Sequence, residues 1–288
     1  MFDLLFAKTF LIVGGMLVIT TFFSRINKAY ETISEAIITI AGSFILLFAI
    51  MFFDEIFPLN IILVGVFSGF VGWSLGPTIG MLGESYKMRK YIKASPLESK
   101  TVITNEKRSF MNKFFGPRDE KKTMYYLKSD PKKLFDSESE QYKTVINEII
   151  TGVSFKRDTY QQDWQNIVFQ AMMATTLAVL FTAGLVFSSS FNFGIMGGYL
   201  FIALIILIIM GILNALIFKS RFFSLIKAYA GVIVFTGYLL YDFNVLEERM
   251  NIGDDSWSSA VRISVNLYLD IINLFLDLLQ ILAESGGN

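Results

Sequence analysis

Long apolar stretches alternate with short polar segments along most of this chain. Seven stretches have about the length, roughly 20 residues, that a helix needs to cross a bilayer. They are residues 4–23, 36–53, 56–83, 167–189, 195–218, 222–241 and about 258–283. The first stretch lacks the small-x-small cleavage site of a secretory signal peptide, so it is also predicted to be a membrane helix. The pattern predicts an all-α membrane protein, a seven-transmembrane helix bundle with its termini on opposite sides.

The seventh stretch carries a polar stripe. At 100° per residue, four polar residues fall on one face of the helix, within about 60° of Asp270: Asn266, Asp270, Asn273 and Asp277. Leu, Ile, Phe and Tyr occupy the other faces. A stripe with two carboxylates cannot face lipid tails, so it is expected to face protein or water and to mark a functional site.

Asp242 is a candidate partner for Asp270. It ends the sixth apolar stretch, whereas Asp270 lies about twelve residues into the seventh. The two depths match if the sixth helix continues through residues 243–246, and we expect that it does. Two carboxyl groups in contact cannot both ionise cheaply, so the pair would hold one proton and act as a pH switch without histidine. The alternative is that each aspartate bonds a neighbouring Ser, Asn or Tyr and serves packing alone.

The third stretch is rich in glycine at spacings of three or four residues. These glycines stand at positions 65, 69, 72, 76, 80 and 83. Small residues at this spacing favour close packing of neighbouring helices. Pro77 is expected to kink or break the helix, so a broken helix lining a cavity is the alternative to a packing seam.

Residues 84–165 differ from the rest of the chain. They hold 17 of the 25 Lys and Arg residues and 12 of the 25 Asp and Glu residues, a net charge of +5. Short strands are predicted at 101–104 and 124–127, and an amphipathic helix from Ser137 to about Val153 with Glu140 completing its cap. We therefore divide the chain into transmembrane helices 1–3 (1–83), a basic extramembrane insertion (84–165) and transmembrane helices 4–7 (166–288).

Composition narrows the chemistry further. The chain is 53% hydrophobic and 17% charged, with a mean hydropathy of +0.53 and zero net charge. Cysteine and histidine are absent, which excludes disulfides, Cys- or His-dependent catalysis and most transition-metal sites. The basic insertion is expected to be a solvated face near lipid headgroups. Nucleic-acid binding is the alternative, and the interleaved aromatic and basic pattern that would support it is missing.

Three separated motifs resemble the transmembrane Bax inhibitor motif family. The strongest is Gly237–Asp242 (GYLLYD) followed by Asn266–Phe275 (NLYLDIINLF). Residues 67–77 resemble the third helix of the family, and 167–171 with 191–198 resemble its fourth helix and the following turn. The resemblance implies a bundle with the last helix central and a pH-sensitive calcium leak in which Asp242 and Asp270 share a proton and control opening.

The chain departs from the family pattern at several positions. Some members have a basic residue near the end of the second helix that pairs with the two aspartates, but here this region reads Phe53-Asp54-Glu55. Arg262 is a candidate replacement latch. Asn266, Asn273 and Asp277 are candidates to line the path, and Ca²⁺ would bind Asp242 and Asp270 only transiently. Calcium is then the transported ion, and no cofactor is expected.

Two other functional classes are compatible with the sequence. A regulatory membrane protein could act on a membrane protease or a stress response, with residues 84–165 binding a membrane-protein partner. An intramembrane aspartyl protease is disfavoured because Leu267-Tyr268-Leu269 stands where Gly-x-Gly should precede the second aspartate. We therefore expect that the protein is not an enzyme and that it lies in the plasma (inner) membrane. Its expected partners are the lipid bilayer and cations, and not nucleic acid.

Two indications of the orientation in the membrane conflict. Juxtamembrane and short-loop basic residues place the insertion inside by the positive-inside rule. The family arrangement places the N-terminus inside and this loop outside, and we follow the family arrangement.

Overall fold

The chain forms two compact units. The computed structural model describes residues 3–94, 97–103, 121–136, 138–151 and 157–285. One unit comprises residues 1–83 with 165–286, and the other comprises residues 84–164. Each unit is described by itself below.

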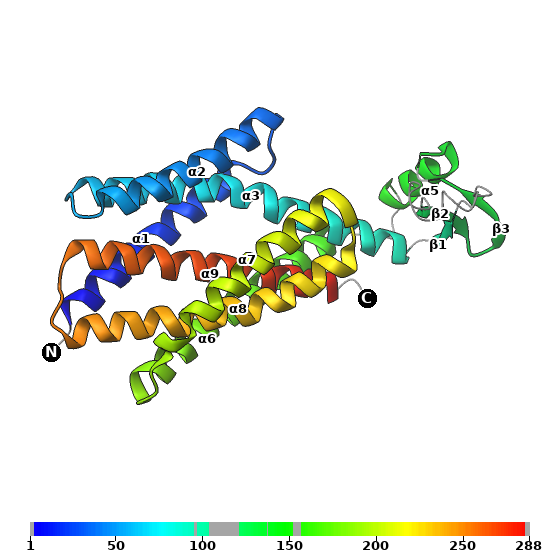
Figure 1. Cartoon of the computed structure of the whole chain (residues 1–288). Helices are drawn as coiled ribbons and strands as arrows, with labels where there is room; N and C mark the ends of the chain where they lie inside the picture. The colour runs from blue at the N-terminus through cyan, green and yellow to red at the C-terminus, as the bar shows by residue number, and fades with distance from the viewer. Residues whose placement is uncertain (1–2, 95–96, 104–120, 137, 152–156, 286–288) are drawn as a thin grey trace, which may run out of the picture. The chain divides into compact units, whose positions relative to one another are not determined.

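Seven helices in the described residues are long and apolar enough to cross a membrane. They are α1 (Leu4–Ile26), α2 (Ile33–Phe53), α3 (Leu59–Ala94), α6 (Arg157–Ser188), α7 (Gly197–Leu213), α8 (Arg221–Asn251) and α9 (Trp257–Ser285) (Figure 1). A 3₁₀ turn, η1 (Phe193–Met196), precedes α7, and a π turn, η2 (Asn214–Phe218), extends it. The predicted all-α membrane fold is confirmed.

Local sequence signals set several helix ends. Asp3 caps α1, because its Oδ1 accepts hydrogen bonds from the backbone N–H groups of Leu5 (2.8 Å) and Phe6 (3.2 Å). Lys219 adopts a left-handed conformation (φ 43°) that ends η2. Ser220 follows directly and caps α8 through the N–H of Phe223.

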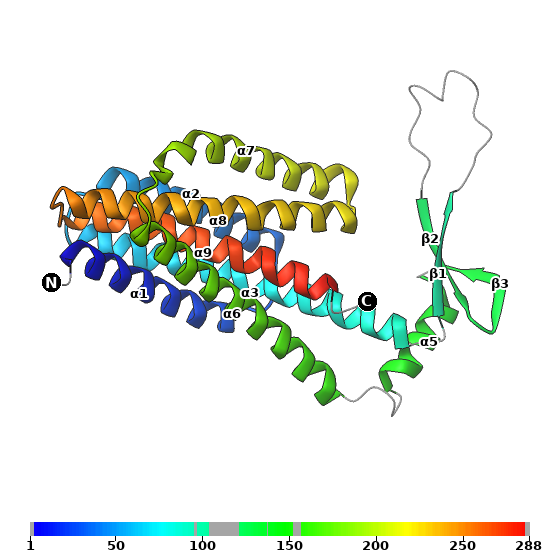
Figure 2. The ribbon, with the colours of Figure 1, turned by 90° about the horizontal axis from the view of Figure 1, so that it is seen from below.

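α8 continues well beyond Asp242. It runs to Asn251, so the expected extension through residues 243–246 is confirmed. α8 and α9 lie side by side in both ribbon views (Figures 1 and 2). Asp242 consequently lies inside the helix pair and not at its loop end.

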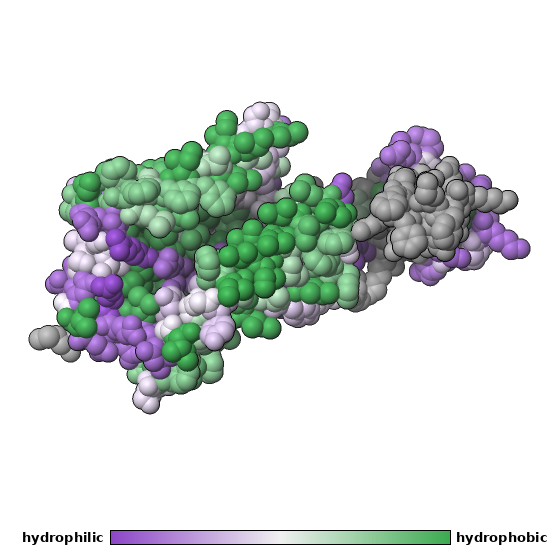
Figure 3. All heavy atoms as spheres, in the orientation of Figure 1, coloured by the Kyte–Doolittle hydropathy of each residue, from purple (hydrophilic) through white to green (hydrophobic). Residues whose placement is uncertain are grey.

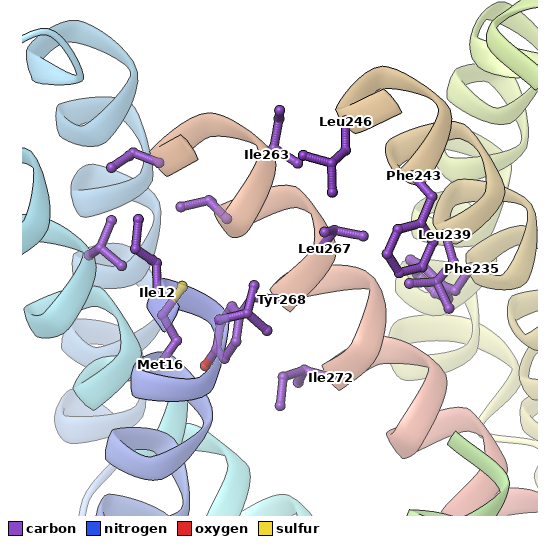
Figure 4. Close-up of a cluster of buried hydrophobic side chains, with 14 of the residues drawn as sticks. Ile12, Met16, Phe235, Leu239, Phe243, Leu246, Ile263, Leu267, Tyr268 and Ile272 are labelled. Atoms are coloured by element: carbon purple, nitrogen blue, oxygen red, sulfur yellow. The ribbon is translucent and has the colours of Figure 1, made fainter. Parts of the chain in front are cut away.

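The last helix forms the centre of the core. Fourteen residues of α9 are buried, against two in α2. Figure 4 shows α9 between α1 and α8, with Tyr268 directed toward α1 and Leu267 toward α8. The buried Tyr268 hydroxyl meets Thr20 Oγ1 at 2.5 Å, and this polar contact joins the two helices inside an apolar core. The Thr20 hydroxyl also donates to the Ser68 carbonyl of α3 at 3.1 Å.

The glycines of α3 permit close packing on α1. A Cβ added at Gly72 would lie 2.5 Å from the Thr20 carbonyl oxygen, and one at Gly80 would lie 2.8 Å from the Lys28 carbonyl oxygen. Gly76 faces the Asn27 carbonyl even more closely. The packing-seam interpretation of this stretch therefore accounts for these glycines. Pro77 was expected to kink or break the helix; the break is wrong, because α3 continues through this residue to Ala94, and the kink stays a prediction.

Large apolar side chains cover the outer faces of the first unit. Ile33 and Phe52 of α2 are 81% and 80% exposed, and Phe201 of α7 is 60% exposed. Figure 3 shows hydrophobic surface over α2 and α7. Burial of this surface requires lipid. The protein is an integral multi-pass membrane protein.

The second unit contains a small antiparallel sheet and a helix. The strands β1 (Leu97–Ile103), β2 (Lys121–Leu127) and β3 (Asp130–Phe135) pair in the order β1-β2-β3. Leu97 faces Leu127 at one end of the first pair, and Ile103 faces Lys121 at the other. The two predicted strands are confirmed within the described residues, whereas β3 was not expected.

The helix of the second unit, α5 (Glu140–Thr151), begins later than predicted. Ser139 provides the cap, since its Oγ accepts from the Tyr142 N–H at 3.2 Å. The expected cap at Ser137 and the expected end at Val153 lie outside the described residues. The ring of Tyr142 lies 4.6 Å from that of Tyr125, which connects α5 to β2.

Candidate functional site

Three acidic residues of α9 face α8 at intervals of seven. Asp270, Asp277 and Glu284 are 6%, 4% and 8% exposed. Seven residues are nearly two helical turns, so the three side chains share one face at a rise of roughly 10 Å between neighbours. Acidic groups are rarely buried without partners, so the groups opposite them define the chemistry of this interface.

The first of the three acids, Asp270, meets another acid. Asp242 of α8 is 3% exposed, and its carboxyl group lies close enough to that of Asp270 for a hydrogen bond between them. Such a bond requires a proton on one of the two groups, because an ionised carboxylate can only accept. The second oxygen of Asp270, Oδ2, has no hydrogen-bond partner in the described part of the chain. The predicted pair is therefore in contact.

The packing-only alternative assigned each aspartate a Ser, Asn or Tyr partner. In the described residues, no hydrogen bond joins such a side chain to Asp242 or Asp270. The hydroxyl of Tyr238 is close enough to interact electrostatically with both carboxyl groups. The pair is thus polar and buried, and Asp270 Oδ2 has no hydrogen-bond partner among the described residues.

The other two acids, Asp277 and Glu284, meet cations. Lys227 Nζ lies 3.4 Å from Asp277 Oδ1, and Arg221 binds Glu284. Both basic residues belong to α8. The sequence did not indicate these partners, because Lys227 lies within an apolar stretch and its direction depends on how α8 rotates against α9.

Arg262 does not contact the aspartate pair. Its guanidinium binds Asp54 at the end of α2, and Ser258 Oγ donates to the same carboxylate at 2.9 Å. Burial alone raises the pKa of Asp54, but these two donors more than offset it and hold the pKa below its usual value. In this structure Arg262 connects the end of α2 to the start of α9. The predicted latch between Arg262 and the Asp242–Asp270 pair (the dyad) is not formed.

The remaining stripe residues lie apart from the dyad. Asn266 is exposed and, with Arg262, lines a cavity of about 420 Å³ between α2 and α9. Asn273 donates from Nδ2 to the Leu269 carbonyl of its own helix at 2.9 Å. Of the predicted stripe, only Asp270 and Asp277 are buried. Among the described residues no three acidic groups converge as a metal site would require.

The fold and the buried charges define a class of protein: a polytopic membrane bundle with ionisable groups inside the membrane-spanning region. Residues 149–287 match the family described as inhibitor of apoptosis-promoting Bax1. This match confirms the Bax inhibitor family for the C-terminal half of the chain, which includes α8 and α9.

Proteins from a virus, a plant and a yeast are each similar to part of the chain. The Golgi anti-apoptotic protein of vaccinia virus (strain Lister) is 39% identical over 121 residues, 42% of this chain and 48% of the viral protein. Protein LIFEGUARD 4 of Arabidopsis thaliana is 33% identical over 118 residues, 40% and 46% of the two chains. Bax inhibitor 1 of Schizosaccharomyces pombe is 32% identical over 123 residues, 42% and 44%. The matched segment spans a little under half the length of these relatives.

Proposed function

We propose that the protein is a pH-sensitive calcium or cation leak channel gated by the Asp242–Asp270 pair. The observation that supports this most is the direct contact of two buried carboxyl groups on neighbouring membrane helices. Ionisable residues inside membrane spans are costly and usually mark ion or proton pathways. Asp270 Oδ2, which lacks a hydrogen-bond partner among the described residues, offers a free oxygen to a cation.

The chemistry of the pair suits a transient cation site. Ca²⁺ prefers oxygen ligands and holds tightly only where several converge. Two carboxyl groups that share a proton carry one negative charge, which is enough to attract a cation. They provide too few ligands to retain it. Full protonation removes this charge, so we expect uptake to fall as the pH is lowered.

Reconstituted protein tests the proposal. Ca²⁺ uptake into liposomes is measured across pH for the wild type and for Asp242→Asn and Asp270→Asn. The matched control is Asp255→Asn, which removes an exposed carboxylate from the α8–α9 loop. The dyad variants should change the pH dependence and the control should not. Unchanged uptake in both dyad variants would refute gating by this pair.

A second candidate function is a regulatory membrane protein that acts through protein contacts. The observation that favours it is the separate unit of residues 84–164, with its own sheet and helix. Most of this unit, residues 84–148, precedes the segment matched by the family. Deleting residues 86–163 separates the two functions: retained uptake with lost partner binding assigns regulation to the insertion. We place the protein in the plasma (inner) membrane under both proposals.

A further inference from the structure

Asp277 is a buried acid that gating by the dyad does not use. It lies two turns beyond Asp270 on the same face of α9, and its side chain keeps 6% of its surface. The protein therefore holds a second carboxylate along the α8–α9 interface, at a different depth from the first. A buried carboxylate needs a compensating charge, and its immediate surroundings show how that is provided.

The two oxygens of Asp277 face different groups of α8. Oδ1 faces Lys227 Nζ at 3.4 Å. Oδ2 lies over Gly231, in space that the first carbon of any side chain at that position would occupy. Glycine at 231 therefore makes the room in which the carboxylate lies.

The lysine contact is loose. Charge-assisted N–H···O bonds are typically about 2.7–2.9 Å long, shorter than the 3.4 Å between Lys227 and Asp277. The Lys227 side chain retains 29% of its surface and is the more exposed partner. Its ammonium is a compact charge on a flexible four-carbon stem, so it can move away from the carboxylate without displacing the helix.

We propose that Asp277 is a second cation-binding carboxylate whose site is occupied by the ammonium of Lys227, which a passing cation must displace. This proposal rests on the cation-leak function proposed above. Lys227 acts as a built-in competitor that lowers basal passage, and Gly231 leaves the room that the Asp277 carboxylate occupies. The ligand class is a hard metal cation such as Ca²⁺, because the site offers carboxylate oxygen.

Two measurements on the full-length protein test the proposal. The first is Ca²⁺ uptake into liposomes, which should rise several-fold in Lys227→Met. The second is the melting temperature in detergent with and without Ca²⁺ at constant ionic strength. A ligand that binds the native state raises the melting temperature. Ca²⁺ should therefore stabilise Lys227→Met more than the wild type, and Lys227→Met/Asp277→Asn should lose this excess.

Arg221→Met is the matched control. It also removes the cation from an α8–α9 ion pair whose acid, Glu284, is buried, and should gain neither uptake nor Ca²⁺-dependent stability. The proposal is overturned if Lys227→Met behaves like this control in both measurements, or if its extra stabilisation persists without Asp277. If Lys227→Met does not fold, Ca²⁺ uptake by Asp277→Asn tests the proposal instead. Uptake below the wild-type value supports the proposal, and unchanged uptake overturns it.

The two proposals fail in different ways. If the wild type takes up no Ca²⁺, the leak function is refuted. The melting measurement still determines whether Asp277 binds Ca²⁺ once Lys227 is removed. If the wild type takes up Ca²⁺ and Lys227→Met does so equally, the leak stands and the role of Lys227 is refuted.

Discussion

A methyl group at position 231 tests how closely α8 and α9 pack around Asp277. An alanine Cβ at Gly231 would lie 2.7 Å from Asp277 Cγ and would overlap its Oδ2. With 6% of its surface exposed, the carboxylate cannot move into solvent without leaving Lys227. Gly231→Ala should therefore separate the buried pair and reduce the stability of the bundle.

The size of the effect follows from two opposing contributions. Separating a buried ion pair costs about 3–5 kcal/mol. Alanine favours a helix over glycine by about 1 kcal/mol. The expected net loss is about 2–4 kcal/mol in the free energy of unfolding. Denaturation of the purified protein in detergent micelles measures it.

Two comparisons isolate the cause. Gly184→Ala places the same methyl inside α6, where nothing lies within 4 Å, and should leave stability unchanged or raise it by at most about 1 kcal/mol. In an Asp277→Ala background the Gly231→Ala penalty should vanish, because the clashing group is gone. Equal stability of Gly231→Ala and Gly184→Ala, or a penalty that persists without Asp277, would refute the reasoning.

Three further changes have expected outcomes. Arg262 and Ser258 hold the pKa of Asp54 low against the opposing effect of burial. The ionised Asp54 therefore stabilises the fold fully above the unfolded-state pKa of about 3.9, and this stabilisation is lost as the pH falls through the lower folded-state pKa. Asp54→Asn should flatten the acid limb of a stability-versus-pH curve, and a limb that stays equally steep would contradict this. Tyr268→Phe removes the 2.5 Å contact with Thr20 and should lower the free energy of unfolding, measured by denaturation, by about 1 kcal/mol. Unchanged stability would show that this contact does not stabilise the bundle. Ser139→Ala removes the α5 cap and should cost about 1 kcal/mol within residues 84–164, detected as faster hydrogen exchange in α5; unchanged exchange would exclude that role.

Apolar length alone predicted the membrane helices, because the bilayer imposes a minimum span. The contact of Asp242 with Asp270 also followed from sequence, once the sixth helix was extended to match depths. The extension was required because a helix ending at Asp242 would have left the two carboxyl groups at different depths.

The partners of the other charges could not be predicted in the same way. Periodicity places Asp277 on the face of Asp270, but it does not give the rotation of α8 that directs Lys227 toward it. The polar stripe spans a wide arc, and only one edge of it meets α8, so Asn266 is exposed although Asp270 is buried. Asp54 and Arg262 are 208 residues apart, and only the packing of α2 beside α9 shows that they form a pair.

A proton shared by Asp242 and Asp270 is the central claim, and infrared spectroscopy tests it most directly. The wild type, at the pH at which uptake is measured, should show the carbonyl stretch of a protonated carboxyl group in a buried setting. This band should disappear in Asp242→Asn/Asp270→Asn and persist in Asp255→Asn. A wild-type spectrum without the band, or a band that survives in the double variant, would contradict proton sharing by this pair.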